Sequence, residues 1–561
     1  MMKPLMLAAA SIISVLVQTS ASDLSKIYVK DGQFVDLDGR IRLFRGINSV
    51  IKHFPWYDPQ MLDSERHRQL GEWGFNAIRL GAMWSGVEPE QGHINETYID
   101  ILKEIVDGLQ TNGIYTYLDM HQDVLTEVAS YNGIPRWLSS QFRSPDHAFP
   151  WPMKDRAGFS TWACGYFTQE ISNGFQQLYT EHKEDFANVW RQIAGRFRGM
   201  PEILGYELLN EPWTGDFYED FSILLPGNAG HELLEPFFNS AHEAVREVDT
   251  ETLIFWEPVT YAYIVNSEPN IILDTLIDSF FKSQNYSIAL PIIKQVCGDL
   301  EEGAVEEIMN IKGIQSAMER IKNKYSNIKG PGSTQQQRPS VLGPGFSAPP
   351  GGETYLNRTV MSYHYYCWAL GYSSDQEFDP ALRFVCDDVL GPMVFNTAGA
   401  RAEELGGSAR MLTEFGECDP DISHPDYQGT IQCEAVLAEA DKHLQSWSYW
   451  DTASGGIFWN GEGEVNWNTV KVFTRPYPPA TAGTPVSLSF DPDTRLMEYS
   501  YLPNLQIIAP TEVYVPSLIY PEGADIHTSD HAAWNHDPQD TNKIHITAFG
   551  EDLVTVIISP K

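Results

Sequence analysis

The chain has 561 residues, of which 42% are hydrophobic and 20% charged, so it carries enough apolar surface for a large folded core and is not a disordered protein. Its 38 Lys and Arg against 75 Asp and Glu give a net charge of -37. This charge repels phosphate backbones and argues against nucleic acid as a partner. The length predicts one large domain and one smaller one.

Residues 1–22 have the pattern of a cleavable secretory signal peptide. Lys3 precedes an apolar run from Leu5 to Val17, and small residues follow as far as Ser22. The alternative is an uncleaved membrane anchor, although the run is short for a bilayer span. We expect the protein to be secreted or delivered to a lysosomal or digestive compartment, because both routes use this signal.

Six cysteines follow in the chain, and an oxidising compartment favours disulfides among them. Proximity favours Cys367–Cys386 and Cys418–Cys433, with Cys164 and Cys297 left over, although six cysteines allow 15 pairings. The spacing is wrong for a zinc site. Three N-x-[ST] triplets, which predict glycosylation in the same compartment, begin at Asn95, Asn285 and Asn357.

From about Ile41 onward, short apolar runs alternate with helical segments, which is typical of parallel β/α units. The runs are Arg42–Asn48, Asn76–Met83, Ile114–His121, Ile203–Asn210, Thr252–Glu257, Thr359–Tyr366, Arg410–Glu414 and Trp447–Trp450. The clearest helical segments are Met61–Trp73, Tyr98–Asn112 and Phe237–Val248. Eight β units predict an α/β fold, a (β/α)8 TIM barrel over residues 23–469.

Two segments depart from this alternation. The connection over about residues 261–353 is unusually long, and it is either a tolerated surface insertion or a lid over the site. Within it, Ala304–Tyr325 is amphipathic and Gly330–Gly352 predicts a flexible tether. Residues 470–561 predict a small all-β sandwich domain. Its expected strands are Val486–Phe490, Leu496–Leu502, Leu505–Ile508, Glu512–Leu518, Lys543–Thr547 and Leu553–Ile558.

Carboxylates follow two of the expected barrel strands. The fourth run ends in Asn210-Glu211-Pro212-Trp213 and the seventh in Thr413-Glu414-Phe415-Gly416. A barrel brings the carboxyl ends of its strands to one face. Hydrolysis of a sugar acetal needs one acid to protonate the departing oxygen and one carboxylate to meet the oxocarbenium-like centre. A single Glu in this position is as well explained by an ion pair, but the pair Glu211 and Glu414 favours catalysis.

Other strand ends supply polar and aromatic side chains at the same face. We expect Arg79 to hold the charge of the nucleophile and lower its pKa, and Tyr366 to hydrogen-bond it. We expect His364 to face the acid/base and Trp450 to form an apolar floor against a sugar ring. Taken singly, His364 and Trp450 are equally well explained as core residues. The full set at these strand ends is Arg79, His121, Asp123, His364, Tyr366 and Trp450.

Several motifs together identify a family. They are Asn76-Ala-Ile-Arg-Leu80, Leu118-Asp-Met-His-Gln-Asp123, Gly205-Tyr-Glu-Leu-Leu-Asn-Glu-Pro-Trp213, Ser362-Tyr-His-Tyr-Tyr366 and Leu412-Thr-Glu-Phe-Gly416. The set resembles glycoside hydrolase family 5 and, within it, the endoglycoceramidases. The resemblance covers the barrel from about Ile41 to Asn460 and, more loosely, the C-terminal domain. The long insertion after Tyr261 is its chief departure from the compact family pattern.

The resemblance implies a retaining hydrolysis, with Glu211 as acid/base and Glu414 as nucleophile, at the bond between glycan and ceramide. It implies that Asp123 and Lys52 contact the sugar next to the cleaved bond. The partner is then a glycosphingolipid, met in transient contact with a membrane or micelle surface, and no cofactor or metal is implied. The remaining implied site residues are Arg79, His121, Asn210, His364, Tyr366 and Trp450.

Several alternatives stay open at this point. Apolar residues after the acid/base strand either line a channel for ceramide or form the core face of a helix. Other activities of the same fold are a β-glucosylceramidase, a galactose-specific endoglycoceramidase and a β-glucanase. A noncatalytic glycolipid-binding protein is the alternative from another class. The candidate channel residues are Phe221, Ile223, Leu224, Leu225, Leu233, Leu234, Phe237 and Phe238.

Overall fold

The structure is a computed structural model that describes most of the chain. The described residues are 24–127, 131–144, 165–166, 168–220, 223, 227–259, 345–366, 383, 385–416, 418–452 and 457–561. The predicted signal peptide, most of the long insertion, and Cys164, Cys297 and Cys367 lie outside these ranges. Within them, no helix is both long and apolar enough to span a bilayer.

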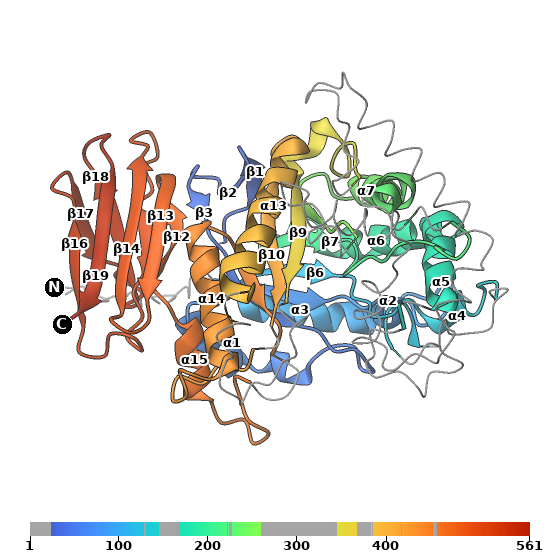
Figure 1. The fold of residues 1–561 in the computed structure, drawn as a ribbon, viewed down its shortest axis with the longest axis horizontal. Helices are drawn as coiled ribbons and strands as arrows, with labels where there is room; N and C mark the ends of the chain where they lie inside the picture. The colour runs from blue at the N-terminus through green and yellow to red at the C-terminus, as the bar shows by residue number, and fades with distance from the viewer. Residues whose placement is uncertain are drawn as a thin grey trace, which may run out of the picture.

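Eight parallel strands close into a barrel, in the order β10-β11-β4-β5-β6-β7-β8-β9. Each overlaps one of the eight apolar runs, so the predicted barrel is confirmed (Figure 1). The strands stop a few residues short of several predicted ends, because the polar residues there leave the ladder and form the site. The strands are β4 (Arg45–Ser49), β5 (Ala77–Gly81), β6 (Tyr115–Asp119), β7 (Ile203–Glu207), β8 (Leu253–Trp256), β9 (Thr359–Tyr365), β10 (Ala409–Phe415) and β11 (Trp447–Tyr449).

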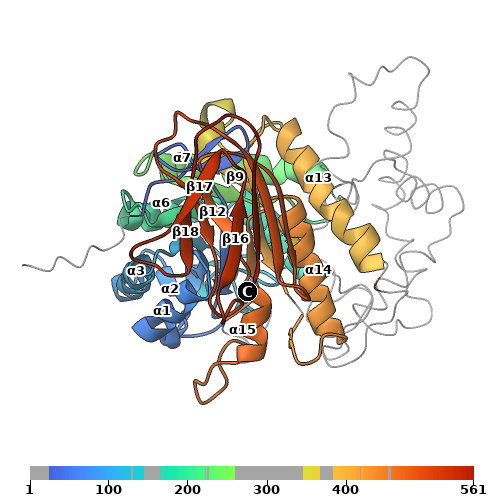
Figure 2. The ribbon, with the colours of Figure 1, turned by 90° about the vertical axis from the view of Figure 1, so that its left-hand side faces the viewer.

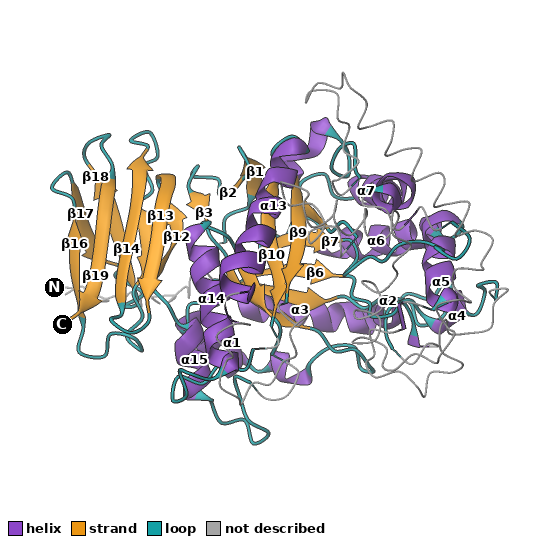
Figure 3. Cartoon of the chain, viewed as in Figure 1, coloured by secondary structure: helices purple, strands orange, loops and turns teal. Residues whose placement is uncertain are grey.

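Helices surround the barrel strands (Figure 3). The helix expected over Tyr98–Asn112 runs from Glu96 to Gln110, and the side chain of Asn95 caps it by accepting the Tyr98 N–H at 3.2 Å. Its buried residues recur at helical spacing and face the barrel. The helices are α1 (Ser64–Glu72), α2 (Trp84–Val87), α3 (Glu96–Gln110), α4 (Arg136–Ser139), α5 (Gln169–Thr180), α6 (Lys183–Phe197), α7 (Glu235–Arg246), α13 (Gly391–Glu404), α14 (Gln428–Lys442) and α15 (Trp467–Phe473).

The end of the barrel at which the strands begin is filled by apolar side chains. Phe44 is fully buried there and packs edge-on against Phe34 and Tyr115, with ring centroids 5.2 and 5.4 Å apart. Tyr117 stacks on Phe255 at 5.0 Å. This packing closes one end of the barrel and leaves the polar strand ends at the other.

The C-terminal domain is a sandwich of two antiparallel sheets that share one apolar core. One sheet has the order β1-β2-β3-β12-β15-β18-β17 and the other β13-β14-β19-β16. The first sheet includes three strands from the start of the chain, since Ile41 pairs with Thr481. The strands are β1 (Tyr28–Lys30), β2 (Gln33–Val35), β3 (Ile41–Arg42), β12 (Tyr477–Thr481), β13 (Gly483–Asp491), β14 (Leu496–Pro503), β15 (Thr511–Tyr514), β16 (Ala524–Thr528), β17 (Ala532–His536), β18 (Lys543–Ala548) and β19 (Val554–Pro560).

The sandwich lies against the closed end of the barrel, because β3 leads directly into β4 (Figures 1 and 2). The sequence analysis assigned residues 28–42 to the barrel domain. In the structure they form strands of the sandwich sheet. The boundary predicted after residue 469 falls inside α15.

The strand predicted over Leu505–Ile508 is wrong, since this segment is a turn between β14 and β15. The side chain of Asn504 accepts the N–H of Gln506 at 3.0 Å, and the carbonyl of Asn504 accepts the N–H of Ile507 at 3.0 Å. These bonds close a tight turn, which overrides the apolar composition of the segment.

The C-terminal end of the long insertion packs against the barrel, whereas the sequence predicted a flexible tether there. Phe346 is buried, with its ring 4.5 Å from that of Trp256 and 6.1 Å from that of Phe238. The N–H of Gly351 donates to the side chain of Asn239 at 2.9 Å. Residues 345–352 are thus fixed to α7 by an aromatic anchor, and residues 260–344 lie outside the described ranges.

The disulfide predicted between Cys418 and Cys433 is confirmed. It joins the loop after β10 to α14, with Cα atoms 5.6 Å apart. Cys386 is also disulfide-bonded. Its predicted partner, Cys367, lies outside the described residues.

Candidate active site

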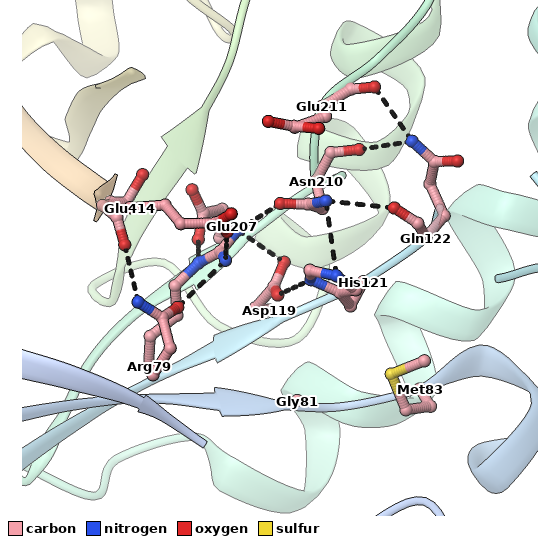
Figure 4. Close-up of polar contacts among 12 residues, drawn as sticks. Arg79, Gly81, Met83, Asp119, His121, Gln122, Glu207, Asn210, Glu211 and Glu414 are labelled. Carbon is pink, nitrogen blue, oxygen red and sulfur yellow. Dashed lines mark hydrogen bonds and ion pairs between the residues drawn. The ribbon is translucent and has the colours of Figure 1, made fainter. Parts of the chain in front are cut away.

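Arg79, in the middle of β5, is the centre of a buried network at the open end of the barrel (Figure 4). Its Nε lies 2.5 Å from Glu207 and its Nη1 2.9 Å from Glu414. Its Nη2 lies 3.1 Å from Asp119 and donates to Asn210 Oδ1 at 2.8 Å. Its Nη1 also donates to Asn48 Oδ1 at 3.1 Å. A single guanidinium therefore holds three carboxylates and two amides in place.

The charge balance of this network depends on the ion pairs. Burial alone would lower the pKa of Arg79, but the charges of Asp119, Glu207 and Glu414 raise it well above its usual value. A buried charge is costly unless it is paired, and here each partner is in direct contact. Arg79 is therefore a fixed cation beside Glu414.

Glu414, near the end of β10, accepts a hydrogen bond from the Tyr366 hydroxyl on the oxygen that Arg79 does not hold. Burial raises the pKa of the Glu414 carboxyl, while His364 and Arg79 lower it and the charge of Glu211 raises it. The direction differs from the expectation that Arg79 would depress this pKa. Arg79 acts in the expected sense, but desolvation in the closed strand ends outweighs it.

Glu211 follows β7 and has a backbone φ of 39°, a left-handed conformation that is unfavourable for a residue with a side chain. Its N–H donates to Glu257 Oε2 at 2.8 Å, and its carbonyl accepts from Gln122 at 2.9 Å. Its Oε1 lies 2.9 Å from Nδ1 of His364. Burial, followed by the negative charge of Asp123, raises the pKa of the Glu211 carboxyl to about 7.

The two carboxylates face each other with His364 beside both. One oxygen each of Glu211 and Glu414, together with a ring nitrogen of His364, lie within 4.8 Å of one another. A separation of about 5 Å is typical of glycosidases that retain anomeric configuration, because one carboxylate must reach the sugar directly. Burial lowers the pKa of His364 to about 4, so the ring is neutral beside a protonated Glu211.

The same three side chains form the one group, among the residues that the structure describes, whose atoms lie close enough together to hold a metal ion. Glu414 is already bound by Arg79 and Tyr366, which suits a carboxylate that acts on a sugar. The expected absence of a metal or cofactor stays a prediction.

A second polar cluster lies beside the pair. His121 contacts Asp119 at 2.8 Å and Asp123 at 3.3 Å, and these two charges, against burial, raise its pKa to about 9. Lys52 lies 2.7 Å from Asp123. Although burial opposes it, the charges of Lys52 and His121 lower the pKa of Asp123. Asp123 is thus an anion at every working pH and offers its oxygens as acceptors.

Trp450 adjoins this cluster. Its ring lies 5.1 Å from that of His121, with the two planes 17° apart, and the Lys52 ammonium lies 4.4 Å from the indole centroid. Asn210 donates to the carbonyl of Gln122 at 3.0 Å, which fixes its amide between Arg79 and His121. The structure therefore brings every predicted site residue to this end of the barrel.

Further residues of the site were missed by the sequence analysis, among them Asp119, Gln122, Glu207 and Glu257. Asp119 and Glu207 are the last residues of the buried strands β6 and β7, and an ionisable residue in a buried strand is itself a signal of a charged centre. Glu257 ends the fifth predicted strand, so the strand-end rule that selected the other residues also applies to it. Gln122 gave no comparable signal.

The apolar residues proposed as a ceramide channel belong to the protein core where they are described. Leu234, Phe237 and Phe238 are fully buried on α7 or at its start, and Phe237 packs on Phe186 with ring centroids 4.4 Å apart. Leu233 and Ile223 are also buried. Of the two alternatives, the lipid channel is therefore wrong for these residues and the core face is confirmed. The remaining candidates, Phe221, Leu224 and Leu225, lie outside the described ranges.

Comparison with known proteins identifies the family. Residues 35–456 match the model of the cellulase family, glycosyl hydrolase family 5, and residues 475–556 match that of the family 5 C-terminal domain. The chain belongs to glycosyl hydrolase family 5. In agreement with this family, the Asn-Glu-Pro motif with Glu211 follows β7, and Glu414 lies near the end of β10. Both Glu residues are thus at the carboxyl ends of barrel strands, where barrel enzymes have their active sites.

Three relatives of this family 5 chain are informative. It is 26% identical to an endoglycoceramidase of Cyanea nozakii, over 99% of this chain and 93% of that protein. It is 27% identical to an endoglycoceramidase of Hydra vulgaris, over 87% and 79%. Its fold is similar to that of endo-glycoceramidase II from Rhodococcus sp. in a ganglioside GM3 complex, with a TM-score of 0.65, 21% identity, and 94% and 99% of the two chains covered.

Proposed function

We propose that this family 5 glycosidase cleaves the β-glycosidic bond between the oligosaccharide and the ceramide of glycosphingolipids and releases both parts intact. The observation that carries the proposal is the similarity to endoglycoceramidases, which covers 99% of this chain in one relative and 87% in another. The carboxylate pair supports it, because a retaining glycosidase needs this separation and these protonation states.

In the first half of the reaction, Glu414 attacks the anomeric carbon of the sugar joined to ceramide. Arg79 and Tyr366 orient the attacking carboxylate, each by a hydrogen bond to a different one of its two oxygens. Glu211 gives its proton to the ceramide oxygen as the bond breaks, so ceramide leaves as an alcohol. The glycan is then attached to Glu414 as an ester.

In the second half, Glu211 takes a proton from water, and the resulting hydroxide displaces Glu414 from the anomeric carbon. The exchange of roles depends on charge. Formation of the ester removes the negative charge of Glu414, one oxygen of which lies within 4.8 Å of an oxygen of Glu211. A like charge this close favours the protonated form of a carboxyl group, so its loss favours release of the proton. Glu211 then loses its proton more readily and acts as the base.

The neighbouring cluster binds the glycan. Asn210, held by Arg79, is placed to hydrogen-bond the sugar 2-hydroxyl, an interaction that strengthens in the transition state. Asp123 and Lys52 present an anion and a cation to adjacent hydroxyls, with the Trp450 ring as an apolar surface beside them. Transient contact with a membrane or micelle surface delivers the lipid substrate.

The test is mass spectrometry of the products after purified protein is incubated with lactosylceramide or a ganglioside at mildly acidic pH. We expect free ceramide and the intact oligosaccharide in equal amounts. Glucosylceramide and cellotriose are incubated in parallel, and Glu414→Gln serves as the inactive control. Hydrolysis of glucosylceramide or cellotriose, with the oligosaccharyl lipid untouched, would assign a different activity of the same site.

We also propose that the protein enters the secretory route and acts outside the cell or in a lysosomal or digestive compartment. The signal pattern of residues 1–22 and the Cys418–Cys433 disulfide support this placement. Sequencing the N-terminus of the mature protein tests it, since an uncleaved Met1 would contradict removal of a signal peptide.

A further inference from the structure

Glu257 is a fully buried carboxyl group that the catalytic cycle described above does not use. It follows β8 directly, at the same end of the barrel as the catalytic pair. Buried carboxyl groups are costly and are usually retained as partners of a cation. Glu257 has no such contact within the described structure, because its one hydrogen bond goes to the main chain of Glu211 and its Oε1 has no partner there.

Glu257 contacts Glu211 from the main-chain side. Its Oε2 accepts the Glu211 N–H at 2.8 Å, at the residue whose φ of 39° is unfavourable for a non-glycine residue. The carbonyl of Phe255, two residues earlier, accepts the N–H of Leu208 at 3.0 Å. The end of β8 therefore holds the segment after β7 at two points, and the second of these points is the acid/base residue itself.

Glu257 also adjoins the side-chain partner of Glu211. The same Oε2 lies 3.8 Å from Nε2 of His364, and Nδ1 of His364 lies 2.9 Å from Oε1 of Glu211. Nε2 has no hydrogen-bond partner among the described residues. Glu257 is thus the group that adjoins both the backbone of Glu211 and the ring that orients its carboxyl.

We propose that Glu257 is a positioning residue for Glu211, which fixes the main chain of the acid/base and, beside His364, the direction of its carboxyl group toward the leaving oxygen. The inference rests on the proposed role of Glu211. In this proposal Glu257 does not contact the substrate. Replacing Glu257 should therefore slow only the steps in which Glu211 transfers a proton.

The surroundings indicate that Glu257 does this as a neutral acid. The groups that face it are Glu211 and Glu207 from β7 and the segment after it, His364 from β9 and Arg79 from β5. Burial, then the charges of Glu211 and Glu207, raise the pKa of Glu257 well above its usual value, and Arg79 offsets this only in part. A neutral Glu257 keeps its carbonyl-type acceptor for the Glu211 N–H and places no charge beside the acid.

The experiment compares kcat/KM of Glu257→Ala for two lactosides that differ in the leaving group. An alkyl β-lactoside needs protonation of its oxygen, whereas 2,4-dinitrophenyl β-lactoside does not. We expect a loss of about 10- to 100-fold on the alkyl lactoside and less than about 3-fold on the dinitrophenyl lactoside, because general acid catalysis is worth about 10²- to 10⁴-fold and is only partly lost. Equal losses on both substrates, or none on either, would overturn the proposal.

Conservative variants and a matched control separate positioning from folding. Glu257→Gln keeps the acceptor and the shape, so we expect it to recover activity on the alkyl lactoside and to keep the alkaline limb of the pH profile. A limb moved to lower pH would show that Glu257 is ionised and would overturn its role as a neutral acid. Glu202→Ala removes another buried carboxyl, one residue before β7 at the opposite end of the barrel, and should leave the ratio of the two lactosides unchanged.

Glu211→Ala keeps this test separate from that of the proposed function. With the dinitrophenyl lactoside and azide, it should give a lactosyl azide of retained configuration, since azide then replaces water as the second nucleophile. No rescue, or an inverted azide, would reject Glu211 as acid/base. A third outcome is that azide rescues Glu211→Ala while Glu257→Ala loses the same activity on both lactosides. This outcome would reject the role of Glu257 and leave that of Glu211 intact.

Discussion

The two ends of the barrel both bury side chains, but with opposite chemistry. At the end that faces the sandwich, Phe34, Phe44 and Tyr115 pack ring against ring. At the other end, Arg79 and Glu414 are also buried, but they carry polar groups that contact each other. Burial of apolar area stabilises the fold, whereas burial of charge costs stability and shifts pKa values. The comparison teaches that one end stabilises the barrel, whereas the other end keeps the groups of the proposed reaction at a cost in stability.

The largest expected effect is that of Glu414→Gln at the charged end. The amide keeps the shape of the side chain but cannot attack the anomeric carbon, so we expect kcat/KM to fall about 10⁴-fold or more, as for other nucleophile knockouts. Steady-state kinetics with an aryl lactoside measures this, and thermal unfolding should remain cooperative. The matched control is Glu202→Gln at the apolar end, which should keep its activity. More than about a hundredth of the activity left in Glu414→Gln would contradict the assigned nucleophile.

Phe44→Ala at the apolar end should have the reverse pattern. The ring is fully buried between Phe34 and Tyr115, and its removal should cost about 3–5 kcal/mol of unfolding free energy through lost burial and a residual cavity. Chemical denaturation measures this loss, and Phe44→Leu should recover most of it. We expect kcat/KM of the folded protein to change less than about 3-fold. A large loss of kcat/KM at unchanged stability would show that the two ends are coupled.

The pH dependence of kcat/KM should sharpen the comparison further, with about a tenfold loss per pH unit outside each limb. Glu211 must be protonated to act as acid, so with a pKa of about 7 its contribution is lost as pH rises through about 7. Glu414 must be ionised, and because burial raises its pKa above 4.5, activity is lost as pH falls through that higher value. A profile from pH 4 to 9 measures both limbs.

The variant Asp123→Asn tests the cause of the alkaline limb. After burial, the negative charge of Asp123 is the next cause of the raised pKa of Glu211. Its removal should therefore move the alkaline limb to lower pH, whatever it does to binding of the sugar. A limb that stays in place would contradict this electrostatic origin.

The barrel and its reactive strand ends could be predicted because both follow from local patterns. Eight apolar runs of strand length and two Glu residues after them are visible in the sequence, and parallel strands necessarily bring their carboxyl ends to one face. Asp119 and Glu207 were missed because the runs that contain them were treated as uniformly apolar. Glu257 was missed although it occupies the same kind of position as Glu211.

Features that depend on distant pairing or on the balance of burial could not be predicted. Ile41 pairs with Thr481 because the first strands of the chain complete the sheet of the last domain. Leu505–Ile508 is apolar, yet the side chain of Asn504 closes it into a turn. Leu234 and Phe237 lie in the core and not in a lipid channel, since helical spacing alone does not say which surface a helix meets.

By itself the sequence determined the order of the elements and the family, and it singled out Glu211 and Glu414 as the candidate pair, because strand periodicity and short motifs are properties of neighbouring residues. The tertiary structure decided the state of that pair. Whether Glu414 has a low or a raised pKa, and which groups hold Glu211, depends on desolvation and on contacts between residues more than a hundred positions apart, such as Arg79 with Glu414 and His364 with Glu211. Those contacts exist only once the barrel has closed.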